Sequence, residues 1–133
     1  MLKAYAKHPE RFALVGDIGG TNARLALVKL NTNRLYDICV YPCAEFNSLE
    51  AILQHHIAEQ NLQSIKYAGI AVACPVLSDS FSFTNLPWHS SAEQIRKSLG
   101  LEYVEVQNDF AAIAFSLSCL GGGRMYMRLA KDV

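Results

Sequence analysis

The sequence predicts an α/β domain: a mixed sheet with three meandering N-terminal strands, flanked by helices. Two apolar runs, residues 12–15 and 25–30, have the composition of strands, and the short segment between them leaves room only for a tight reversal. A third β-rich run, residues 34–41, follows a turn at residues 31–33. From there on, apolar runs of strand length alternate with segments of helical spacing, an order typical of an α/β unit.

The spacing of apolar residues predicts the first helix and the strand after it. Ser48 opens a helix near residues 48–60, because the following apolar residues form a stripe with helical period. The members of this stripe are Leu49, Ile52, Leu53 and Ile57. Residues 67–73 form a buried strand whose small side chains allow close helix packing. Residues 78–85 alternate polar and apolar, so Phe81 and Phe83 face one side of an exposed strand or hairpin.

A second helix, near residues 91–99, is predicted from its boundaries. Ser90 and Glu93 have the spacing of a capping box, and Gly100 is suited to end the helix. The strand at residues 103–107 then leads to a polar corner, after which apolar residues return with helical character.

Length and composition indicate a globular domain without a strongly charged surface. The 133 residues suffice for one domain, with 51% hydrophobic and 18% charged residues. The 12 basic and 12 acidic residues balance, which gives no electrostatic basis for binding nucleic acid or an anionic membrane. No apolar stretch reaches the ~20 residues of a membrane helix, and the N-terminus lacks the apolar core of a secretory signal. We therefore expect a cytoplasmic location.

The cysteines and histidines lack the spacing of a metal site. No second Cys or His pair follows the cysteines at zinc-binding distance, so we expect reduced thiols, mostly in strands and the core. They are Cys39, Cys43, Cys74 and Cys119. His55 and His56 would point about 100° apart on a helix and cannot chelate one ion together, which favours a solvated helix face.

The segment between the first two strands has the chemistry of a phosphate-binding turn. Gly19 and Gly20 lack a Cβ, so their backbone can take positive φ and let a bulky anion approach its N–H groups. Asp17, at the mouth of the first strand, is placed to hold Mg²⁺ through water while the metal bridges phosphate oxygens. Thr21 and Asn22 add hydrogen-bonding side chains at the same edge.

Glycine spacing narrows the kind of phosphate site. The spacing excludes a P-loop and a Rossmann fingerprint. The alternative to a phosphate-binding turn is an ordinary hairpin whose glycines only satisfy turn geometry. The full run Asp-Ile-Gly-Gly-Thr-Asn-Ala-Arg is more specific than a bare Gly-Gly pair. It predicts a nucleoside-triphosphate grip built on a β-hairpin.

Four ordered segments resemble one protein family. GDIGGTNARLAL (residues 16–27) is similar to the first phosphate motif of sugar kinases in the actin-like ATPase superfamily, specifically the bacterial glucokinases. AVACPV (71–76), FTNLPW (83–88) and VEVQNDFAAIAF (104–115) match in the same order, and the resemblance runs from about residue 12 to 117. It implies ATP and Mg²⁺ as cofactors. It also implies ATP binding by Gly16, Asp17, Ile18, Gly19, Gly20 and Thr21.

The resemblance implies a fold and its extent. The element order is that of a ribonuclease H-like domain, the unit that is duplicated in actin-like ATPases. Residues 1–117 would form this N-terminal lobe. Residues 118–133 lack apolar periodicity and depart from the family's continuation, so we expect a divergent tail, truncated or frameshifted near residue 118.

Asp109 lies where an apolar strand gives way to a helix, and position alone leaves two roles open. It could cap the helix, or act at the edge where open α/β sheets bind ligands. A sugar kinase needs a carboxylate to accept the hydroxyl proton during attack on the γ-phosphoryl group, and the resemblance assigns that base to Asp109. It also implies sugar contacts for Asn108 and Asn85, although Asn85 could instead cap its turn. Trp88 is expected to be a packing residue.

The function implied by the resemblance is that of a glucokinase, which phosphorylates glucose with ATP and needs no nucleic acid or membrane. One alternative is a non-catalytic sugar- or nucleotide-sensing regulator of the same superfamily. The eleven residues before residue 12 are too few for the DNA-binding module of such a regulator. Another alternative is an inactive half-domain that pairs through an apolar face, for example as a homodimer.

Overall fold

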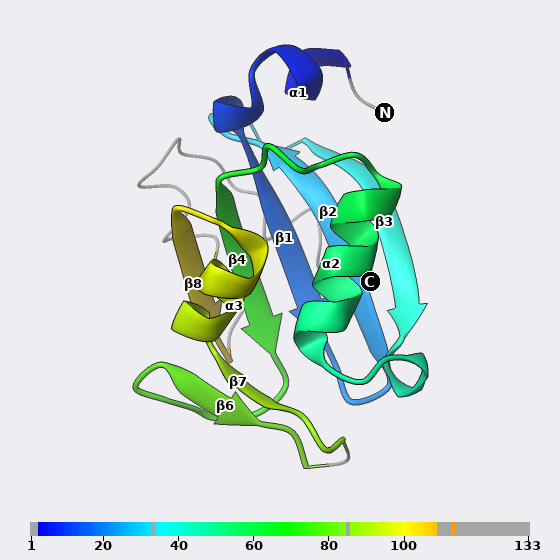
Figure 1. Cartoon of the computed structure of the whole chain (residues 1–133), viewed down its shortest axis with the longest axis vertical. Coiled ribbons are helices and arrows are strands. Elements are labelled where there is room, and N and C mark those ends of the chain that lie inside the picture. Colours follow the sequence, from blue (N-terminus) through cyan, green and yellow to red (C-terminus); the bar gives the residue numbers. More distant parts are fainter. Residues whose placement is uncertain (1–2, 33, 85, 109–112, 114–133) are drawn as a thin grey trace.

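The computed structural model describes residues 3–32, 34–84, 86–108 and 113, and it has a five-stranded sheet with α2 and α3 against one face (Figure 1). The strand order is β3-β2-β1-β4-β8. The bounds are β1 Phe12–Ile18, β2 Asn22–Lys29, β3 Leu35–Pro42, β4 Tyr67–Val72 and β8 Tyr103–Gln107. β1, β2 and β3 pair antiparallel in succession, whereas β4 is parallel to β1 and β8 is parallel to β4. The predicted mixed sheet with its N-terminal meander is confirmed.

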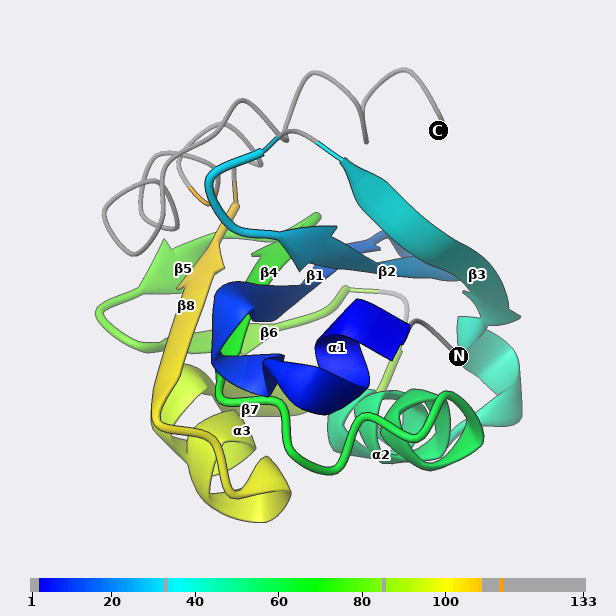
Figure 2. The same cartoon turned by 90° about the horizontal axis from the view of Figure 1, so that it is seen from above.

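The remaining elements lie around this sheet. The helices are α1 Lys3–Lys7, α2 Leu49–Glu59 and α3 Ala92–Leu99, and short 3-10 turns occur at Pro9–Arg11 and Cys43–Glu45. A second, small sheet has the order β5-β6-β7, with β5 Val76–Leu77, β6 Ser80–Ser82 and β7 His89–Ser91. Figure 2 shows α2 and α3 on one side of the large sheet, seen edge on. No helix in the described part of the chain is long and apolar enough to cross a membrane.

The first strand, β1, is buried on both faces, because its apolar residues are consecutive and successive side chains point to opposite faces of the sheet. Phe12, Leu14 and Ile18 join the core that includes the helical stripe of α2. Ala13 and Val15 point to the opposite face and join a second cluster. β1 extends beyond the predicted residues 12–15, since its pairing with β2 continues through the polar and glycine positions that end the apolar run.

Two helix boundaries follow the sequence prediction. The Ser48 side chain caps α2 by accepting a hydrogen bond from the backbone N–H of Ala51 at 3.0 Å. Gly100 ends α3 with a φ of 67°, in the left-handed region that favours glycine.

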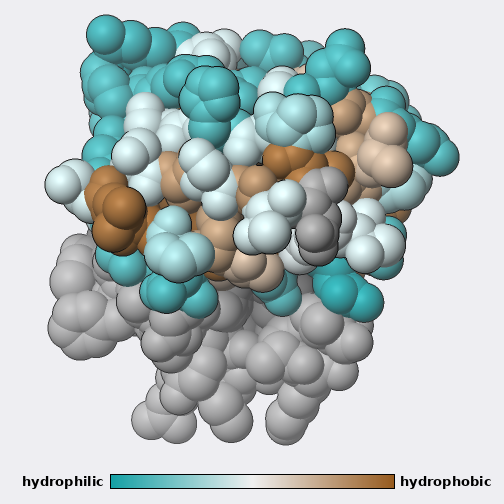
Figure 3. Space-filling model, turned by 90° about the horizontal axis from the view of Figure 1, so that it is seen from below, coloured by the Kyte–Doolittle hydropathy of each residue, from teal (hydrophilic) through white to brown (hydrophobic). Residues whose placement is uncertain are grey.

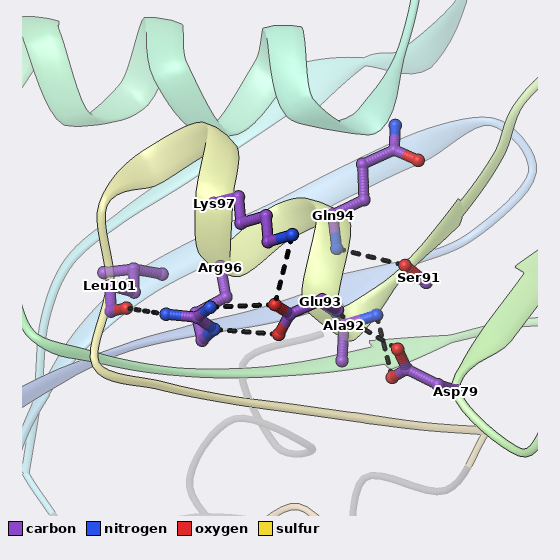
Figure 4. Close-up of polar contacts among 8 residues, drawn as sticks. All are labelled: Asp79, Ser91, Ala92, Glu93, Gln94, Arg96, Lys97 and Leu101. Carbon is purple, nitrogen blue, oxygen red and sulfur yellow. Dashed lines mark hydrogen bonds and ion pairs between the residues drawn. The ribbon is translucent and has the colours of Figure 1, made fainter.

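The predicted capping box at Ser90 and Glu93 is wrong. Ser91 caps α3, accepting from the backbone N–H of Gln94 at 3.0 Å, while the Asp79 carboxylate accepts from the first two N–H groups of the helix (Figure 4). Ser90 belongs to β7 and is buried, where its hydroxyl donates to the Glu50 carboxylate. The pairing of β7 with β6 holds Ser90 in a strand, so the helix begins one residue later.

The solvated face predicted for the two histidines holds for His55 and is wrong for His56. His55 is exposed, and its Nε2 lies 3.3 Å from the Oε2 of Glu59. His56 is 1% exposed, and its Nδ1 lies 2.8 Å from the Tyr41 hydroxyl. Its position seven residues after Leu49 puts it on the apolar stripe of α2, a signal that the sequence already contained.

Phe81 and Phe83 share one side of the 78–85 segment, as predicted, and both side chains are buried, whereas Ser80 and Ser82 on β6 are exposed. Their rings lie 5.9 Å apart, and the buried Trp88 ring packs 5.6 Å from Phe83, which confirms its packing role. Among the described cysteines, Cys43 and Cys74 are buried and Cys39 is partly buried, all with free thiols.

Candidate functional site

The turn between β1 and β2 lines an open hollow at one end of the sheet. The strand register pairs Asp17 with Arg24, and the Gly19 N–H closes the turn by donating to the Asn22 carbonyl at 2.9 Å. The hollow has a volume of about 290 Å³. Its lining residues are Asp17, Gly19, Gly20, Thr21, Asn22 and Arg24. Figure 3 looks onto this end of the molecule, where hydrophilic side chains alternate with apolar patches.

A carboxylate and a guanidinium share the hollow. Asp17 is half-buried, and burial raises the pKa of its carboxyl group, while the positive charge of Arg24 acts in the opposite direction. A carboxylate suits a hard cation, and a guanidinium suits phosphate oxygens. Arg24 is a candidate functional residue without a sequence-based prediction. The available signal was the two-residue period of β2, which puts Arg24 on the same face as Asn22 and opposite Asp17.

The residues of the hollow could hold Mg²⁺ only together with a bound phosphate, which would supply further oxygen ligands to the ion. Asp17 is the one carboxylate in the lining, and the described part of the chain has no group of three or more His, Cys, Asp or Glu that could hold an ion by itself. Mg²⁺ at nucleotide sites takes one or two carboxylates, keeps several waters and completes its shell with phosphate oxygens. A single half-buried carboxylate beside hydroxyl, amide and backbone groups matches that donor set.

Gly16 and Ile18 lie beneath the hollow, not in its lining. Ile18 is fully buried, and a Cβ on Gly16 would lie 2.8 Å from the Leu25 Cδ2 and 3.2 Å from the Ile70 Cδ1. Glycine at position 16 therefore makes room for the core. ATP binding by both residues stays a prediction.

Gly19 and Gly20 do not use the positive φ that glycine allows, because Gly100 is the one described glycine with positive φ. A Cβ on Gly19 would meet the Asn22 carbonyl at an ordinary 3.5 Å. The turn geometry therefore does not require glycine at position 19, and the absence of a side chain there leaves the backbone open to a ligand.

The parallel strands bring a second predicted site residue to the same edge. Asp17 is in register with Ala71 of β4, and Ala71 is in register with Gln107 of β8. Asn108 follows directly and is exposed. Two strand spacings put this corner about 10 Å from Asp17. Ile113 is buried in the cluster on the face of the sheet that carries Asp17.

Two predicted residues, Asp109 and Asn85, lie outside the described residues, as does the predicted tail at 118–133. The Phe83 N–H donates a hydrogen bond to the Trp88 carbonyl at 3.0 Å. The predicted roles of Asp109, Asn85 and Asn108 stay predictions.

The architecture is that of solved sugar kinases. The crystal structure of a glucokinase from an Antarctic psychrotroph superposes with a TM-score of 0.70 and 35% identity, covering 80% of this chain and 34% of that one. A glucokinase of Balamuthia mandrillaris, solved in complex with glucose, gives a TM-score of 0.59 at 13% identity and shares the fold alone. The family model named Glucokinase matches residues 14–131. This chain belongs to the glucokinase family.

Curated relatives agree with this family. The glucokinase of Yersinia enterocolitica is 38% identical over 109 residues, which cover 82% of this chain and 33% of the relative. The glucokinase of Photorhabdus laumondii is 41% identical over 109 residues, which cover 82% of this chain and 34% of the relative. The chain thus spans about a third of the length of the relatives that it matches. Membership of the family supports sugar phosphorylation in general.

Proposed function

We propose that this chain forms the phosphate-binding lobe of an ATP-dependent glucokinase, which converts glucose and ATP to glucose 6-phosphate and ADP in the cytoplasm. The lobe, residues 1–117, would be the ribonuclease H-like unit of the actin-like ATPase superfamily. The observation that carries the proposal is the hollow of the β1–β2 turn, which is lined by Asp17 and by Arg24, its register partner on β2. Glucose as the sugar rests on the names of the relatives.

In this proposal the turn grips the nucleotide phosphates. Backbone N–H groups of the turn and the Arg24 guanidinium would hold phosphate oxygens, as Thr21 and Asn22 would with their side chains. Asp17 would hold Mg²⁺ through water, and the bound ion would neutralise charge on the transferring phosphoryl group.

Proton transfer is assigned to the corner that follows β8. As the glucose hydroxyl oxygen bonds to the γ-phosphorus and the bond to the ADP oxygen breaks, Asp109 would accept the hydroxyl proton. Asn108 and Asn85 would orient the sugar hydroxyls. The nearness of Asn108 to the Asp17 edge of the sheet supports this arrangement, because phosphoryl transfer depends on holding both reactants in line.

The test uses the purified 133-residue chain. Wild-type protein should bind MgATP and phosphorylate glucose in a coupled assay. Asp17→Asn should weaken MgATP binding at least about tenfold, because it removes the one carboxylate of the hollow. Asp109→Asn should keep MgATP affinity and lower phosphorylation about 10²–10⁴-fold.

Asp37→Asn is the matched control for charge removal. Asp37 is exposed on β3 with a φ of 55°, a conformation that asparagine tolerates, so this variant should behave as wild type. A wild-type chain that neither binds MgATP nor phosphorylates glucose would reject the proposal. Unchanged MgATP affinity in Asp17→Asn would reject the assigned grip.

A further inference from the structure

Cys43 touches both halves of the β1–β2 turn from the end of the neighbouring strand. Its backbone N–H donates to the Thr21 carbonyl at 2.9 Å, and its thiol donates to the Gly19 carbonyl at 3.5 Å. Cys43 is fully buried at the start of the 3-10 turn that follows β3. It lies outside the lining of the hollow, so it contacts the turn from behind.

These two bonds fix the direction in which the peptide groups of the turn point. In a planar trans peptide the carbonyl and the next N–H point in opposite directions. With the carbonyls of Gly19 and Thr21 drawn to Cys43, the N–H groups of Gly20 and Asn22 point away from it. A turn that binds phosphate needs this orientation, since carbonyl oxygens repel anions and N–H groups attract them.

We infer that Cys43 is a positioning residue, which holds the β1–β2 turn in the shape that receives nucleotide phosphates. This inference rests on the proposed function of the turn. Burial raises the pKa of the Cys43 thiol, so the group remains a protonated donor at neutral pH. Side-chain variants remove only the thiol bond and leave the backbone bond to Thr21, so the expected effects are modest.

The test measures MgATP affinity by calorimetry and amide hydrogen exchange over residues 19–22 in the 133-residue chain. Cys43→Ala should weaken MgATP affinity about fivefold and speed exchange in the turn. Cys43→Ser, which restores a donor, should recover most of the affinity. Cys74→Ala is the control, because Cys74 is also buried but its thiol interacts with the backbone of Ser82. It should change neither readout.

A second measurement needs no variant. MgATP should slow the alkylation of Cys43 by iodoacetamide in the wild-type chain more than that of Cys74, as read by mass spectrometry of the peptides. Wild-type affinity and exchange in Cys43→Ala, or alkylation of Cys43 that bound MgATP leaves unchanged, would overturn the inference.

Failure of the proposed function has a different signature. A wild-type chain that does not bind MgATP would reject the phosphate role of the turn. Comparing amide hydrogen exchange over residues 19–22 between Cys43→Ala and Cys74→Ala would still decide whether Cys43 holds the turn.

Discussion

Lowering the pH should destabilise this protein through His56, a residue of α2 whose buried side chain contacts Tyr41 of β3. The side chain is 1% exposed and its Nδ1 lies 2.8 Å from the Tyr41 hydroxyl, which is itself 3.5 Å from the Glu59 carboxylate. Burial lowers the pKa of His56 to about 4, although the negative charges of Glu59 and Asp37 act in the opposite direction. The folded protein therefore holds this imidazole neutral.

The size of the effect follows from the two pKa values. An unfolded chain binds the proton near pH 6.5, and the folded chain binds it only near pH 4. Between these values the unfolded state binds more protons, so stability falls as the pH falls. Integrated from pH 7.5 to pH 4, this linkage lowers the free energy of unfolding by about 3 kcal/mol. That is a large part of the 5–15 kcal/mol by which domains are typically stable.

Urea unfolding of wild type and His56→Asn at a series of pH values measures this linkage. The asparagine offers a neutral oxygen near the position of Nδ1, so the variant should lose about 3 kcal/mol less than wild type between pH 7.5 and 4. His55→Asn is the matched control, because His55 is the exposed neighbour on the same helix, and it should keep the wild-type pH dependence. Parallel stability curves for wild type and His56→Asn would refute the argument.

Three further substitutions test the fold by urea unfolding at neutral pH. Gly16→Val should lower stability by about 2 kcal/mol or more, because its Cβ would collide with Leu25 and crowd Ile70; a loss within error would contradict that packing. Asp79→Ala should cost about 1 kcal/mol, since it removes the carboxylate acceptor of the Ala92 and Glu93 N–H groups and leaves only the backbone carbonyl of residue 79 as acceptor for Ala92; an unchanged midpoint would show that water replaces the carboxylate. Gly100→Ala should cost about 1 kcal/mol because its φ is 67°, and a stabilised variant would count against a left-handed C-cap.

Local patterns in the sequence were enough to predict most elements of the fold. The stripe that begins at Leu49 predicts α2, and Ser48 and Gly100 mark helix ends, because period and capping depend on residues within one or two turns. The acidic residue and glycines between two apolar runs predict the position of the turn for the same reason. The order of the strands in the meander also follows from short connections.

Tertiary structure decided whatever depends on residues far apart in the chain. Asp79 joins Ser91 in capping α3 because the small sheet brings the two segments together. His56 is neutral because β3 covers it with Tyr41. Asp17 and Asn108 share an edge only through the parallel register of β1, β4 and β8. Cys43 reaches the turn because β3 pairs with β2. Periodicity reports which face a side chain takes, whereas its neighbours on that face are set by the pairing and packing of distant segments.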